Sequence, residues 1–64
     1  MAKHYVWVHT AGEYFEYESV TSAYSSLTRA KKMIGGEWVQ VETREYLQTV
    51  GNYSFNRLTK VEIQ

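Results

Sequence analysis

Side chains that could carry acid–base or metal chemistry are few in this 64-residue chain. His4 and His9 are its two histidines, and an odd spacing along an extended strand places them on opposite faces. A metal ion needs ligands that converge on one point, and the absence of cysteine excludes a thiolate zinc site. The sequence therefore predicts no metal site, no cofactor and no disulfide.

Three glutamates, Glu13, Glu16 and Glu18, are spaced closely enough to suggest a general acid–base pair. We expect them along one short, solvent-facing strand. Acid–base catalysis needs a desolvated pocket that separates the pKa values of its two carboxyl groups, and a short strand does not build one. We therefore predict no catalytic residue and no enzymatic activity.

Charge and glycine patterns argue against phosphate binding. Seven basic and seven acidic residues cancel, whereas proteins that bind nucleic-acid backbones cluster Lys and Arg. Arg29, Lys31 and Lys32 form a small basic patch, which is typical of a solvated helix face. Gly35-Gly36 follows the expected helix, whereas a phosphate loop precedes one.

Aromatic side chains are unusually abundant, at 16% of the residues. We expect one domain over residues 1–64, close to the size at which a single core is barely sufficient. So small a core cannot bury ten rings, and exposed rings are common at protein interfaces. Stability must come from an aromatic core or from association with another chain.

The stretch Val20–Gly36 has the only helical spacing, an apolar stripe of Val20, Ala23, Leu27, Ala30 and Ile34. Ser19, Thr21 or Ser22 is expected to cap its N-terminus. Gly35 is expected to end it, with Lys31 and Lys32 in the last turn.

The flanking sequences predict two hairpins. His4–His9 and Glu13–Val20 are expected to pair through a turn at residues 10–12. A strand over Glu37–Thr43 would open a long second hairpin that turns at residues 50–52, which pairs Val41 with Val61. A two-residue turn at Gly51-Asn52 is the competing register. The result is an α+β fold, a ββαββ antiparallel sheet with one helix packed on one face, from which residues 45–57 could extend as an arm.

Two arrangements of the sheet faces remain open. In the favoured one the helix covers the valines, so that Tyr5, Trp7, Trp38 and Tyr46 lie on the uncovered face. In the other, Tyr5 and Trp7 enter the core and the valines are exposed. With the arm included, the predicted partner-binding residues are Tyr5, Trp7, Trp38, Tyr46, Tyr53 and Phe55.

The segments HYVWVHTAGEYFEY, TSAYSSLTRAKKMIG and EWVQVETREYLQTVGNYSFNRLTKVEIQ, without Pro or Cys, form a hairpin–helix–hairpin layout. This layout resembles the small proteins that phages encode to inhibit or redirect host enzymes or defence systems. The resemblance spans the whole chain as layout and implies action in the host cytoplasm by occupying a surface of a larger protein. We therefore predict a non-enzymatic protein-binding module, also able to form a homodimer. No apolar run is long enough to span a membrane.

Two other functions remain open. A single-stranded nucleic-acid binder could stack bases on Tyr5, Trp7 and Trp38, but the neighbouring charges are mixed rather than basic. A small nucleotide or signal molecule could instead bind at a dimer cleft lined by aromatic rings.

Overall fold

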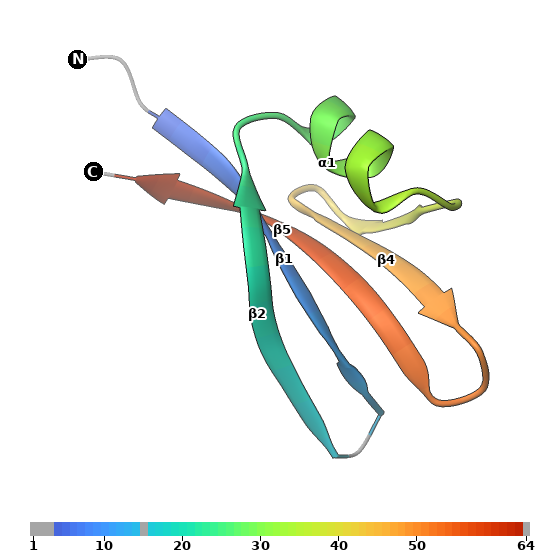
Figure 1. Cartoon of the computed structure of the whole chain (residues 1–64). Coiled ribbons are helices and arrows are strands. Elements are labelled where there is room, and N and C mark those ends of the chain that lie inside the picture. The colour runs from blue at the N-terminus through green and yellow to red at the C-terminus, as the bar shows by residue number, and fades with distance from the viewer. Residues whose placement is uncertain (1–3, 15, 64) are drawn as a thin grey trace.

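The computed structural model describes residues 4–14 and 16–63, and in this part of the chain one helix lies against a single five-stranded sheet (Figure 1). The elements in chain order are β1 (His4–Glu13), β2 (Tyr17–Tyr24), α1 (Leu27–Ile34), β3 (Val39–Glu42), β4 (Glu45–Val50) and β5 (Ser54–Ile63).

The sheet is antiparallel throughout and has the strand order β2-β1-β5-β4-β3. The last strand, β5, lies at its centre and pairs along its whole length with β1, from His4 opposite Ile63 to Glu13 opposite Ser54. The predicted α+β class is confirmed. The predicted ββαββ layout is wrong, because the chain after the helix forms three strands instead of two.

The helix is shorter than predicted and begins at Leu27 instead of near Val20. Residues 20–24 belong to β2, where Val20 pairs with Thr10 and Ala23 with Val8. β-Branched residues and serines have weak helix propensity, so the hydrogen bonds available from β1 decide the conformation of this stretch. The predicted end is confirmed: Gly35 is the C-cap with a φ of 83°, and Lys31 and Lys32 lie in the last turn.

The first helical turn is capped by Ser26, not by the predicted Ser19, Thr21 or Ser22. The Ser26 hydroxyl accepts a hydrogen bond of 3.1 Å from the backbone N–H of Arg29.

Replacing Ser26 by alanine should lower the unfolding free energy by about 1 kcal/mol, the usual cost of losing such a cap. Thermal denaturation followed by circular dichroism measures this loss. Ser25→Ala is the matched control, because Ser25 lies before the cap, and equal melting temperatures for the two variants would contradict the assignment.

Both predicted turns are displaced. Residues 10–12 lie inside β1, and the first hairpin turns between Glu13 and Tyr17. The second turn contains Gly51 at a φ of 68° and is closed by the pair of Val50 and Ser54.

Both predicted registers for the strands that flank the second turn are also wrong. Val61 pairs with Val6 on β1, whereas β3 folds back onto β4 and sets Val39 opposite Leu47. Residues 45–57 therefore do not extend as an arm, because Ser54 to Arg57 pair with β1. The long hairpin fails because the chain reverses after Glu42, which leaves β5 free to pair with β1.

The helix covers the aromatic side of the sheet, so the favoured arrangement of faces is wrong. Trp7, Ala30 and Leu58 form the buried cluster. The Trp7 ring meets that of Tyr46 edge-on, with centroids 5.7 Å apart. A helix of eight residues covers little area, and these large rings fill the space beneath it where valines would leave voids. We call the opposite side of the sheet the open face. By strand register its apolar residues are Val6, Val8, Val20, Ala23, Val39, Leu47, Phe55, Val61 and Ile63, and Phe55 is the buried one among them.

Candidate protein-binding site

The tips of the two hairpins are tied to each other. The backbone N–H of Tyr14, in the turn between β1 and β2, donates a 2.7 Å hydrogen bond to the carbonyl of Tyr53, in the turn between β4 and β5. The ring of Tyr14 also packs on that of Phe55, with centroids 4.8 Å apart. Two loops that would otherwise move independently therefore hold one another in place.

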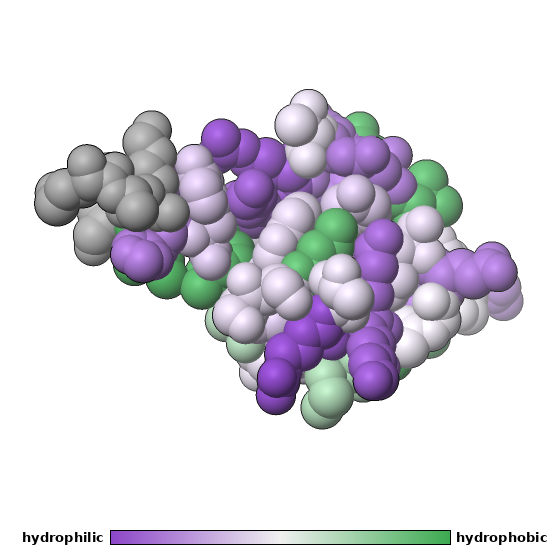
Figure 2. Space-filling view, turned by 90° about the horizontal axis from the view of Figure 1, so that it is seen from above, coloured by the Kyte–Doolittle hydropathy of each residue, from purple (hydrophilic) through white to green (hydrophobic). Residues whose placement is uncertain are grey.

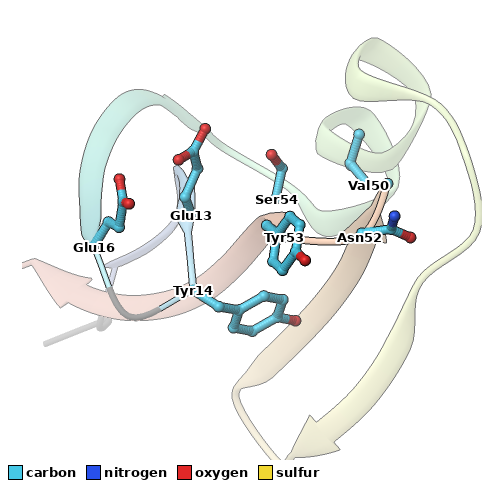
Figure 3. Close-up of a pocket in the computed structure, with 8 residues that line it drawn as sticks. Glu13, Tyr14, Glu16, Val50, Asn52, Tyr53 and Ser54 are labelled. Atoms are coloured by element: carbon cyan, nitrogen blue, oxygen red, sulfur yellow. The ribbon is translucent and has the colours of Figure 1, made fainter.

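A groove of about 480 Å³ lies between these tips, and Figure 3 shows its lining. The carboxylates of Glu13 and Glu16 point to one side, and the ring of Tyr14 points away from them, below that of Tyr53. Tyr53 is 72% exposed, the highest value among the large hydrophobic side chains that the structure describes. We call this groove, lined by Glu13, Tyr14, Glu16, Val50, Gly51, Asn52, Tyr53 and Ser54, the tip groove.

The tip groove has the chemistry of a receptor for a cationic side chain. Within the described residues, the ion pairs of the protein join Arg57 to Glu18 and to Glu45, and none involves Glu13 or Glu16. Aromatic ring faces attract ammonium and guanidinium groups, and carboxylates accept strong hydrogen bonds from them. The exposed ring of Tyr53 and the two carboxylates of this groove can supply both interactions.

A chain of polar side chains supports the sheet between the helix and the tips. The Asn56 amide donates to Gln48 Oε1 at 2.8 Å, so its oxygen faces His9, whose Nε2 donates to it at 2.9 Å. The remaining ring nitrogen, Nδ1, then accepts from the Thr21 hydroxyl at 2.6 Å. At the other end Gln48 donates to the carbonyl of Gly35 at 2.8 Å. The network joins four strands to the end of α1, and such linked bonds reinforce one another.

A second polar cluster lies on the open face. Arg57 forms a 3.0 Å ion pair with Glu18 and lies 3.9 Å from a carboxylate oxygen of Glu45. Thr10 donates a hydrogen bond to the other oxygen of Glu18. Glu13, Glu16 and Glu18 thus do not share one strand as predicted, because Glu13 ends β1, Glu16 lies in the turn and Glu18 belongs to β2.

The six predicted partner-binding residues fall into separate regions. Trp7 and Phe55 are buried, and Trp38 and Tyr46 are half-buried against the core. Tyr5 carries two cations on its ring, Lys60 at 4.4 Å and Arg44 at 5.4 Å from the centroid. Tyr53 is the exposed member, and Phe55 supports the tip beneath Tyr14. Glu13, Tyr14, Glu16 and Asn52 were not predicted, although the mixture of Tyr and Glu in GEYFEYE indicates an amphipathic tip.

Across residues 4–14 and 16–63, no group of three or more metal-binding side chains converges. The same residues include no helix with the length and apolar character needed to cross a membrane. Seen from above, polar and apolar side chains are interspersed on the surface (Figure 2).

Comparisons with known proteins leave the interpretation to this geometry, since no family model, no curated protein and no solved structure matches the chain.

Proposed function

We propose that this chain is a non-enzymatic protein-binding module, an inhibitor or modulator of the phage type, whose tip groove receives a Lys or Arg side chain of a larger protein. One observation carries the proposal: the groove presents a highly exposed tyrosine beside two carboxylates on loops that are already tied together. Preorganised loops lose little entropy on binding, so more of the contact energy becomes affinity.

The composition of the groove suits a long basic side chain. Val50 supplies an apolar wall for the methylene groups, Tyr53 supplies an exposed ring face, and Glu13 and Glu16 supply carboxylates for the charged head. A bound acidic segment would meet like charge there.

Replacing Tyr53 by alanine should weaken binding of the partner about 10-fold, the effect of removing a tyrosine at the centre of an interface, without loss of fold. Isothermal titration calorimetry measures this effect. The ligands are decapeptides that differ only at one central position, which is Arg, Lys, Ala or Glu. The Arg and Lys peptides should bind. Both the substitution Glu13→Gln in the protein and added salt should lower the affinity for these peptides.

Met33→Ala is the matched control, because Met33 is 64% exposed on the helix and lies outside the groove. Equal affinity of the four peptides, or equal loss in Tyr53→Ala and Met33→Ala, contradicts the proposed site.

The nucleic-acid alternative has one supporting observation, three cations that contact tyrosine rings on the helix side: Lys31 at Tyr46, and Lys60 and Arg44 at Tyr5. Its proposed stacking platform loses Trp7, which is buried, and Trp38 uses its indole N–H to bond Gly35. Binding of mixed single-stranded oligonucleotides that falls steeply with salt would favour this function, and so would a partner complex that nuclease dissolves.

A further inference from the structure

We propose that a second copy of this chain covers the open face of the sheet. This face lies opposite α1, away from the core cluster, and within the described residues the Tyr14 ring covers Phe55 at its tip end. Val39 is 66% exposed there, Ile63 is 49% exposed and Val61 is 42% exposed. A sheet packed on one side ordinarily presents polar residues to water on the other, so an apolar open face indicates an interface.

The surface area of the chain is larger than expected for a folded monomer of its mass. A folded monomer of 7.5 kDa should expose about 4,250 Å², whereas this chain exposes 4852 Å², roughly 600 Å² more. A standard protein interface removes about 800 Å² from each partner, so covering the open face would bring the exposed area below the value expected of a monomer.

The small core explains why this partner must always be present. The buried hydrophobic side chains of the described residues are Trp7, Ala30, Phe55 and Leu58, and Leu58 is the large one that is fully buried. Domains below about 70–80 residues without disulfides or metals rarely obtain enough stability from one core. A target protein is met only after the module has folded, whereas a second copy is available whenever the chain is made.

Charge on the open face also permits self-association. Arg57 lies between Glu18 and Glu45, so its positive charge offsets part of their negative charge and lowers the repulsion between two identical faces. Two copies related by a two-fold axis near Val61 would bring Val6, Val61 and Ile63 against the same residues of the other copy. β-Branched side chains interdigitate well between two stacked sheets, which pack about 10 Å apart.

Analytical ultracentrifugation of the full chain from 1 to 200 µM tests the proposal. The wild-type protein should sediment at twice its chain mass over the upper part of this range. Val61→Glu should weaken the dimer about 100-fold or more, because it places an unpaired carboxylate in an apolar interface. Val61→Thr keeps the branched shape and β-propensity and should weaken it less, so an effect on assembly can be recognised even where Val61→Glu folds poorly.

Met33→Glu is the control for added charge at an exposed apolar position away from the open face, and Tyr53→Ala is the control for the tip groove. Both should remain dimeric, which separates this proposal from the proposed function. A monomeric wild-type protein at 200 µM overturns the proposal. Dimers that persist in folded Val61→Glu overturn it too, since they would place the contact at an edge strand.

Discussion

Replacing Leu58 by alanine is expected to remove a large part of the unfolding free energy of this protein. Leu58 has no exposed surface and lies on the central strand, in one cluster with Trp7 and Ala30. Truncating a fully buried leucine costs about 2–5 kcal/mol, since the space is only partly refilled. A domain of this size has a total unfolding free energy of roughly 3–10 kcal/mol, so this one change removes a large part of it.

Urea denaturation at fixed protein concentration, followed by tryptophan fluorescence, measures the loss. Leu27→Ala is the matched control, because Leu27 packs against the same cluster but is only half-buried, and alanine is the better helix former. We expect the midpoint of Leu58→Ala to fall well below that of Leu27→Ala. Equal midpoints would show that Leu58 is not the centre of the core.

The helix illustrates how far local sequence determines this fold. Its end was predictable, because Gly35 and the preceding lysines act within one turn. Its start was not, because Val20 and Ala23 have helical spacing and share one face of β2 only through the register shift opposite His9 and Thr10. The pairing of β2 with β1 decides between them, and at Val20 and Ala23 that pairing joins residues ten and fifteen positions apart.

The sheet faces were ambiguous for a related reason. Tyr5, Trp7 and His9 alternate with Val6 and Val8, and both sets are compatible with burial. Two features decide which face the helix covers: the area that an eight-residue helix can cover, and the rings that can fill the space beneath it. The central position of β5 was missed because its pairing with β1 joins the two ends of the chain, a contact for which local sequence carries no signal.

The candidate site was predictable only in part. Tyr53 was expected to bind a partner and is indeed exposed, but its binding role stays a prediction. The tip groove needs Tyr14 and Tyr53 side by side, and these residues meet because β5 runs beside β1 to the end of the strand. Glutamates at the first turn became candidates only when this register was known.

Gly12 should be the residue on which this register at the tip depends most. It lies opposite Glu18 on β2 and opposite Phe55 on β5, and it is buried. A Cβ at this position would lie 2.7 Å from Glu18 Cα and closer still to the carbonyl oxygen of Tyr17. These are backbone atoms, so the strain can be relieved only by moving β2 away from β1.

Gly12→Ala is therefore expected to cost about 3 kcal/mol or more, the upper range for overpacking, and to displace Glu13 and Glu16 from the tip groove. Amide hydrogen exchange should accelerate at Ser19 and its neighbours on β2, and peptide binding should fall with it. Gly51→Ala is the control: a Cβ there meets nothing within 4 Å, and its φ of 68° accounts for a cost of about 1–2 kcal/mol. If Gly12→Ala exchanges and melts like Gly51→Ala, the close approach of β2 to β1 at the tip is wrong, and with it the geometry on which the tip groove rests.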